Sequence, residues 1–129
     1  MRNAGKKALD LYASGAAARA TKKPDRSPVT EADKAVEAHL REVFDKHFPT
    51  FAFLGEETGK KESASGLRFI VDPIDGTRLP QGIPTWSVLL GIECDGVPVV
   101  GIAHFPADGD MLVGATGPGV THNGGHLSR

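Results

Sequence analysis

Two acidic segments, each directly after a short apolar run, carry side chains that could hold a cation. The first is Gly55-Glu56-Glu57, and the second is the stretch DPIDGT at 72–77. Carboxylates and backbone carbonyls are the oxygen donors that a hard ion such as Mg²⁺ prefers. Because Asp72 and Asp75 are three residues apart beside a rigid strand, both carboxylates can converge on one point. This loop is therefore a candidate magnesium site.

The same loop also offers groups that suit a phosphate. Gly76 allows the backbone to approach a ligand closely, and Gly76 and Thr77 offer backbone N–H groups beside the metal. Glu56 could help to hold a second ion, and two metals would clamp the attacking and leaving oxygens of an in-line displacement. A water deprotonated towards Glu56 or Thr77 would then be the nucleophile.

Simpler explanations stay open for each segment. An Asp-Pro-x-Asp-Gly stretch is more often a turn than a metal site, and a Glu-Glu pair in a loop is usually solvated surface. Asp33 lies three residues after Thr30, so it is most simply the acid of a helix capping box. Spacing alone leaves these alternatives undecided.

The composition describes one ordinary domain spanning residues 1–129, with 40% hydrophobic and 24% charged residues. A net charge of −1 provides no broad field for attracting nucleic acid or an anionic membrane. The single cysteine, Cys94, excludes an internal disulfide and indicates a reducing compartment. No apolar run is long enough for a membrane span. We therefore expect a cytoplasmic protein.

Helical spacing dominates the first part of the chain and strand patterns the rest. A helix is expected at 6–19, and a second should begin after Thr30 as N-cap and end near His47, before Pro49. Strands are expected at 51–54, 68–71, 85–94, 97–105 and 111–116. The dipeptides Asp95-Gly96 and Asn123-Gly124 predict tight turns. The order predicts an α+β fold with two helices packed on an antiparallel β-sheet.

Other reactive side chains are better explained by packing. His122 and His126 have the four-residue spacing of a helical zinc pair, but they lie in a glycine-rich hairpin where no helical face exists. His104 on a strand is expected to pack or to be a satisfied polar group. Cys94 lies inside an apolar strand, where a thiol is usually inert.

Three segments at matching spacing carry a family resemblance: SPVTEADKAVE (27–37), FLGEETG (53–59) and FIVDPIDGT (69–77). The set resembles the inositol monophosphatase family of lithium-sensitive, magnesium-dependent phosphatases. The stretches TWSVLLG and GIAHFPA look closer to its histidinol-phosphatase-like branch. The resemblance implies the N-terminal, metal- and phosphate-binding domain of the inositol monophosphatase / fructose-1,6-bisphosphatase-like carbohydrate phosphatase fold.

The resemblance also implies roles for the matching positions. Glu56 would be a metal ligand that orients the nucleophilic water, and Asp72 would bridge two Mg²⁺ ions. The backbone carbonyl of Ile74 would bind one ion and Asp75 the other. Glu57 matches the motif without an implied ligand role.

The phosphate side of the implied site lies next to these ligands. Asp75, Gly76 and Thr77 would form the substrate-binding segment, with backbone N–H groups of Gly76 and Thr77 on the phosphate. The Thr77 hydroxyl would pair with Asp33 and help to activate water. Glu56, Thr77 and Asp33 are thus the implied catalytic residues.

Two departures from the family pattern bear on function. Family members are roughly twice as long, and their second half carries a Trp-Asp-x-Ala segment whose Asp ligates a metal; no such segment occurs here. After Thr77 the chain reads RLPQGIPTW, where Pro80 could break the short helix that would point its N-terminus at the phosphate.

The implied function is Mg²⁺-dependent hydrolysis of a small phosphorylated metabolite, histidinol phosphate or inositol monophosphate, by metal-activated water. Relatives are commonly dimers, so the resemblance implies a homodimer, with neither nucleic acid nor membrane as a partner. The alternative is a truncated, non-catalytic fragment that binds metal but lacks the second-half Asp ligand and the substrate pocket. A plain α+β module without metal is the third interpretation; it predicts that Asp75→Asn leaves Mg²⁺ and Mn²⁺ affinity unchanged.

Overall fold

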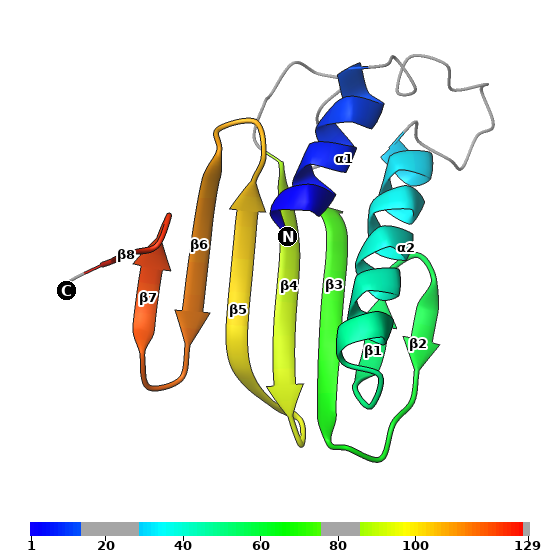
Figure 1. Ribbon diagram of the computed structural model, residues 1–129, viewed down its shortest axis with the longest axis vertical. Helices are drawn as coiled ribbons and strands as arrows, with labels where there is room; N and C mark the ends of the chain where they lie inside the picture. The colour runs from blue at the N-terminus through cyan, green and yellow to red at the C-terminus, as the bar shows by residue number, and fades with distance from the viewer. Residues whose placement is uncertain (14–28, 76–85, 128–129) are drawn as a thin grey trace.

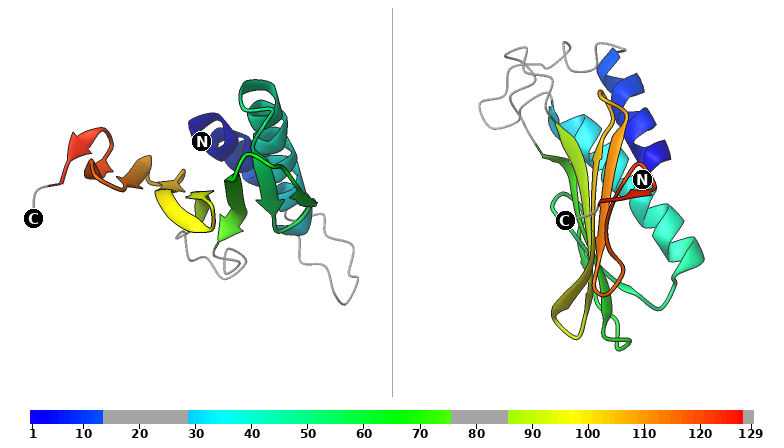
Figure 2. Two further views of the ribbon diagram at one scale, coloured as in Figure 1. Left: turned by 90° about the horizontal axis from the view of Figure 1, so that it is seen from below. Right: turned by 90° about the vertical axis from the view of Figure 1, so that its left-hand side faces the viewer.

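Two helices lie on one face of an eight-stranded sheet in the computed structural model, which describes residues 1–13, 29–75 and 86–127 (Figures 1 and 2). The helices are α1 (Arg2–Ala13) and α2 (Val29–His47). The strands are β1 (Ala52–Gly55), β2 (Gly59–Lys61), β3 (Leu67–Asp75), β4 (Ser87–Cys94), β5 (Val97–Phe105), β6 (Asp110–Ala115), β7 (Gly119–His122) and β8 (Gly125–His126). Helix α2 packs on β3, and α1 contacts β4 and β5. The predicted α+β layering is confirmed.

The sheet has the order β2-β1-β3-β4-β5-β6-β7-β8, and its neighbouring strands are antiparallel with one exception. Strands β1 and β3 run parallel, with Gly55 opposite Val71. The predicted antiparallel sheet is therefore present, with this one parallel pair as the exception. The chain turns back through β2 before it enters β3, so β1 and β3 end at the same edge of the sheet. Glu56 and Asp72 directly follow the last paired residues.

The core forms between the helices and the covered face of β1, β3, β4 and β5. Leu40 of α2 is 2% exposed, and the Phe44 ring stacks on Phe69 with centroids 4.1 Å apart. The other buried apolar side chains in this core are Ala4, Ala8, Val36, Phe53, Val71, Ile74, Trp86, Val88 and Leu90. Full burial of a Val, Leu or Phe side chain contributes about 1.5–3 kcal/mol each. This packing holds α2 against the ends of β1 and β3.

Both predicted tight turns are confirmed by left-handed backbone angles. Asp95 and Gly96 have φ values of 48° and 81°, and Asn123 and Gly124 have 49° and 86°. Two successive positive φ values are the signature of a turn whose twist matches that of the flanking strands. His122 and His126 lie on the paired strands β7 and β8, as expected of a hairpin.

The helix bounds differ slightly from the sequence expectation. Helix α1 begins at Arg2, earlier than predicted, because Ala4 and Ala8 provide a buried face ahead of Leu9. Helix α2 ends at His47 as predicted, but it begins at Val29, so Thr30 lies inside the helix and not at its N-cap. Helix ends are commonly assigned with a difference of one or two residues. The rest of the first predicted helix lies outside the described residues.

Strand β3 extends further than predicted, through Asp75. Its pairing with β4 is irregular between Asp72 and Asp75 and resumes where Asp75 faces Ser87. Pro73 has no N–H to donate to a ladder, so such an irregularity is where a strand tolerates proline. The DPID stretch is therefore part of a bulged strand, whereas the sequence predicted a turn after Asp72.

Among the described helices, none is long and apolar enough to cross a membrane.

Candidate metal and phosphate site

One face of α2 carries a polar stripe toward the ends of β1 and β3. Asp33, Glu37 and Arg41 are spaced four residues apart, which places them above one another on the helix. Asp33 is 8% exposed and Glu37 is fully buried. A buried carboxylate is costly unless hydrogen bonds or a cation compensate its charge. The packing of Val36 and Leu40 on the sheet fixes this stripe against the acidic strand ends.

Parallel pairing brings Glu56 and Asp72 side by side at the edge of the sheet. The pKa of Asp72 is raised to about 6, chiefly by burial and also by the charges of Glu56 and Asp75 and a hydrogen bond with Glu56. A hydrogen bond with the Ile74 backbone opposes the rise. Asp72 therefore lies close enough to Glu56 and Asp75, the acids of the two motif segments, for their charges to act on it.

Asp33 belongs to the same cluster. The pKa of Asp33 is raised to about 7, chiefly by burial and also by repulsion from the charges of Glu57, Glu56, Asp72 and Glu37. Carboxylates that repel one another in this way favour either a shared proton or a bound cation. Asp33 thus lies close enough to the strand-end acids for their charges to act on it. Its role as a simple capping acid is not supported, since its side chain lies among other carboxylates.

Two oxygens in this cluster have no hydrogen-bond partner among the described residues: Asp33 Oδ1 and Asp72 Oδ1. Both are buried side-chain oxygens, and an unpaired buried polar atom calls for a missing partner such as an ion or water. A set of carboxylate oxygens with a nearby carbonyl is the donor chemistry that fits Mg²⁺. Within the described ranges, no three His, Cys, Asp or Glu side chains already form a group that could hold a metal. The donors fit the ion chemically, and the ligand set stays a prediction.

The sequence-predicted residues divide into two groups. The charges of Glu56 and Asp72 act on Asp33, and those of Glu56 and Asp75 act on Asp72. Ile74 is buried within β3 at 8% exposure. Gly76 and Thr77 lie outside the described residues, as do Pro80 and the chain after it up to residue 85. The pairing of Asp33 with the Thr77 hydroxyl and the phosphate contacts therefore stay predictions.

Sequence reasoning missed Glu37. Its carboxylate accepts hydrogen bonds from the backbone N–H groups of Glu57 and Thr58, at 2.8 and 2.6 Å. These contacts join α2 to the loop that begins with Glu56. The four-residue spacing from Asp33 was a usable signal, because it predicts that both acids share one helix face.

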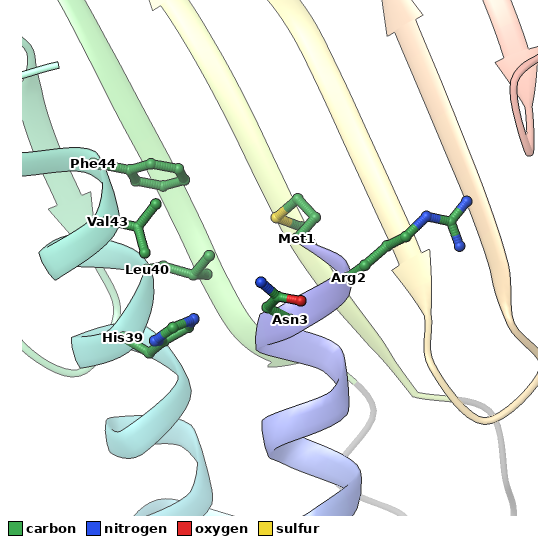
Figure 3. A pocket seen from close by; sticks show the side chains of 7 residues that line it. All are labelled: Met1, Arg2, Asn3, His39, Leu40, Val43 and Phe44. Atoms are coloured by element: carbon green, nitrogen blue, oxygen red, sulfur yellow. The ribbon is translucent and has the colours of Figure 1, made fainter. Parts of the chain in front are cut away.

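Two recesses in the surface lie away from the acidic cluster and are lined by other residues. One, of about 190 Å³, lies between the start of α1 and the later turns of α2 and contains no acidic side chain (Figure 3). Its lining residues are Met1, Arg2, Asn3, His39, Leu40, Val43 and Phe44.

The histidine expected to pack, His104, is 4% exposed. Its Nδ1 has no partner in the described structure, and burial lowers the pKa of the imidazole. It packs, but it is not fully satisfied as a polar group.

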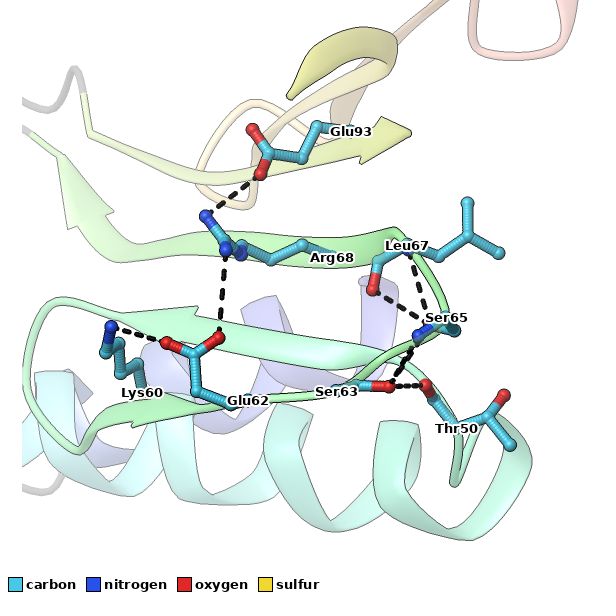
Figure 4. A network of polar contacts seen from close by, with 8 residues as sticks. All are labelled: Thr50, Lys60, Glu62, Ser63, Ser65, Leu67, Arg68 and Glu93. Atoms are coloured by element: carbon cyan, nitrogen blue, oxygen red, sulfur yellow. Dashed lines mark hydrogen bonds and ion pairs between the residues drawn. The ribbon is translucent and has the colours of Figure 1, made fainter. Parts of the chain in front are cut away.

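The second recess borders a surface ion network near the start of β3 (Figure 4). Arg68 pairs with Glu93 of β4 at 3.0 Å and approaches Glu62 at 3.9 Å, and Glu62 also pairs with Lys60. The Lys60–Glu62 pair is exposed on both sides, and pairs of this kind contribute about 0–1 kcal/mol each. The network joins neighbouring strands at the end of β3 away from Asp72 and Asp75, and it shares no residue with the acidic cluster.

Comparison with known proteins places the whole chain in one family. Residues 1–129 match the sequence profile of the inositol monophosphatase family. A histidinol-phosphatase from Chlorobaculum parvum is 38% identical over 122 residues, which cover 94% of this chain and 47% of that protein. Inositol monophosphatase 1 from Solanum lycopersicum is 36% identical over 101 residues, covering 74% of this chain and 37% of that protein.

A solved structure agrees with the same assignment. The native crystal structure of extragenic suppressor protein suhB from Bartonella henselae superposes with a TM-score of 0.83 at 30% identity, covering 97% of this chain and 49% of that one. The chain belongs to the inositol monophosphatase family. It spans about half the length of the curated relatives that it matches.

Proposed function

We propose that this chain provides the metal- and phosphate-binding domain of a Mg²⁺-dependent phosphomonoesterase that acts on a small phosphorylated metabolite. The observation that carries the proposal is a pair of buried oxygens, Asp33 Oδ1 and Asp72 Oδ1, that lie in a cluster of carboxylates and have no hydrogen-bond partner in the described part of the chain. Such a cluster is expensive without a cation. Membership of a family whose curated members include named phosphatases gives the class of reaction.

Four groups would hold Mg²⁺: the carboxylates of Glu56, Asp72 and Asp75 and the backbone carbonyl of Ile74. When bound, the ion supplies Lewis-acid stabilisation of the charge that develops on the phosphoryl group. The Glu56 carboxylate, exposed at the rim of the cluster, accepts a proton from the attacking water. Asp33, with its raised pKa, is suited to share a proton with a neighbouring hydroxyl, for which Thr77 is the predicted partner.

Histidinol phosphate is the first substrate to test, and inositol 1-phosphate is the second. Two relatives named histidinol-phosphatase support this order, at 38% identity for the Chlorobaculum parvum protein and 45% over 86 residues for the Mycobacterium tuberculosis protein. The latter match covers 66% of this chain and 33% of that protein.

A cytoplasmic location agrees with the free thiol of Cys94. A homodimer, implied by the resemblance, is part of this proposal.

The test measures phosphate release from both substrates by the 129-residue chain, with and without Mg²⁺, and measures Mg²⁺ binding by calorimetry. Asp72→Asn is the site variant, and Asp108→Asn, at an exposed carboxylate in the turn between β5 and β6, is the matched control. We expect Mg²⁺ binding that Asp72→Asn removes and Asp108→Asn leaves intact.

The outcomes separate the two leading interpretations. Magnesium-dependent turnover that Asp72→Asn removes supports a site that works within this chain or a pair of such chains. Binding without turnover supports the alternative, a metal-binding fragment that lacks the remaining ligand and the substrate pocket. If Mg²⁺ does not bind, or binds equally to wild type and Asp72→Asn, the proposed site is wrong.

A further inference from the structure

The loop that carries Glu56 is fixed to α2 by one buried carboxylate. Glu37 is fully buried, and its two carboxylate oxygens accept hydrogen bonds from two successive residues of the loop. Oε2 accepts the backbone N–H of Glu57 at 2.8 Å, and Oε1 accepts the backbone N–H of Thr58 at 2.6 Å together with the Thr58 hydroxyl. Hydrogen bonds to an ionised acceptor are about twice as strong as neutral ones. These three donors satisfy a charge that would otherwise be costly to bury.

Arg41, one turn further along α2, adds a second attachment. Its Nη1 donates to the backbone carbonyl and the hydroxyl of Thr58, at 3.2 and 2.9 Å. The guanidinium carbon lies 5.2 Å from the centre of the Phe53 ring, so the side chain is also held by the strand before the loop. The helix therefore holds both the N–H and the C=O of Thr58.

Gly55 shows how closely the loop and the carboxylate fit. A Cβ atom built at this position would collide with Oε1 and Cδ of Glu37 and would lie 2.8 Å from Cε1 of Phe53. Because the backbone here has an ordinary φ, glycine is required by the close approach and not by an unusual turn. The peptide before Glu56 thus lies directly against the Glu37 carboxylate, and the peptides after it are hydrogen-bonded to the same group.

We propose that Glu37 is a positioning residue: by hydrogen bonding to the two peptides after Glu56 and packing against Gly55 before it, Glu37 directs the Glu56 carboxylate toward Asp72 and so sets the affinity for Mg²⁺. This inference rests on the proposed function. Neutral Gln at position 37 keeps the size of the side chain but has a single oxygen acceptor. Its NH₂ group would face a backbone N–H of the loop, so at least one of the two peptides would lose its partner.

The decisive experiment compares Glu37→Gln with Glu42→Gln, an exposed glutamate on the same helix. Amide hydrogen exchange at Glu57 and Thr58 reports the loop, and calorimetry reports the Mg²⁺ dissociation constant. We expect Glu37→Gln to raise exchange at both amides and to raise the dissociation constant about tenfold, the lower end of what the loss of an outer-shell partner costs a metal site. Glu42→Gln should change neither quantity.

A milder variant guards against loss of the fold. Thr58→Ala removes the hydroxyl contacts with Glu37 and Arg41 but keeps both backbone N–H bonds. It should give a smaller change of the same sign, about threefold in the dissociation constant on the scale of one net hydrogen bond. Glu37→Asp retains the charge, so it should restore part of the affinity lost in Glu37→Gln.

The outcomes separate this inference from the proposed function. Faster amide exchange with unchanged Mg²⁺ affinity would make Glu37 a structural brace only and overturn the inference. Unchanged exchange would show that the hydrogen bonds do not hold the loop, which also overturns it. If the wild type binds Mg²⁺ in a manner that depends on Asp72 but not on Glu37, only the inference fails. If the wild type binds no Mg²⁺, both fail.

Discussion

Replacing Asp72 by Asn should stabilise the metal-free chain at pH 8 and, at the same time, remove its response to Mg²⁺. The pKa of Asp72 rises from 3.8 to about 6 in the folded protein. Each pKa unit corresponds to about 1.4 kcal/mol, so the ionised side chain opposes folding by about 3 kcal/mol. Because Asp72 is only partly buried, solvent screening reduces the expected gain to about 2 kcal/mol.

The sign follows from the direction of the shift. A folded-state pKa above the unfolded value means that the folded chain binds the proton more tightly, so ionisation of Asp72 opposes folding above pH 6. As the pH falls from 8 to 4, Asp72 becomes protonated and wild type recovers this stability. The difference between Asp72→Asn and wild type should therefore be largest at pH 8 and vanish near pH 4.

Thermal unfolding measures both effects. For 129 residues the entropy of unfolding is about 0.27 kcal/mol/K, so a gain of about 2 kcal/mol raises the Tm by about 7 °C. Mg²⁺ at one hundred times its dissociation constant should stabilise wild type by about 2.7 kcal/mol and leave Asp72→Asn unchanged. At pH 8, Asp72→Asn should therefore have the higher Tm without Mg²⁺, and wild type should have the higher Tm with Mg²⁺. A lower Tm for metal-free Asp72→Asn at pH 8, or a difference that does not depend on pH, would refute the reasoning; Asp108→Asn is the control.

Three further changes test the cluster, the core and a turn. Metal-free Asp33→Asn should gain about 3 kcal/mol at pH 8, more than Asp72→Asn, because the pKa of Asp33 is about 7 and the side chain is only 8% exposed; a pH series of urea unfolding should show the gain disappear toward pH 4. Leu40→Ala should lose about 3 kcal/mol in the same assay, because Leu40 is 2% exposed in the core; a loss below about 1 kcal/mol would contradict its placement. Gly96→Ala should cost about 1 kcal/mol because its φ is 81°, whereas Gly101→Ala, with an ordinary φ and open space around its Cβ, should not destabilise.

Local chemistry made parts of the fold predictable. Asp95-Gly96 specifies its turn within two residues, and the apolar spacing of α2 is set by its own sequence. Strand β2 was missed because Gly-Lys-Lys has no apolar alternation and pairs only because β1 lies beside it. The extension of β3 past Pro73 was missed for a similar reason. In a sequence, proline predicts a turn. The strand continues here because Asp75 pairs with Ser87 of β4, which the local sequence does not indicate.

Glu37 shows the same limit at the candidate site. The motif SPVTEADKAVE contains it, but its partners lie 20 and 21 residues further along the chain. No local pattern reports a hydrogen bond from a helix to a loop at that distance. By contrast, family motifs mark Asp33, Glu56, Asp72 and Asp75. In the structure, the charges of Glu56 and Asp72 act on Asp33, and those of Glu56 and Asp75 act on Asp72.

The parallel pairing of β1 and β3 explains why these acids can meet at all. In an antiparallel pair, consecutive strands end at opposite edges of a sheet, so the acids that follow β1 and those at the end of β3 would lie a strand length apart. In the parallel pair, Gly55 faces Val71, and the next residues, Glu56 and Asp72, leave the ladder together. The β2 hairpin reverses the chain once and the segment before β3 reverses it again, which produces this register. Open sheets commonly bind ligands beyond the carboxyl ends of parallel strands. Here one parallel pair, covered by the start of α2, is enough to build an acidic cluster.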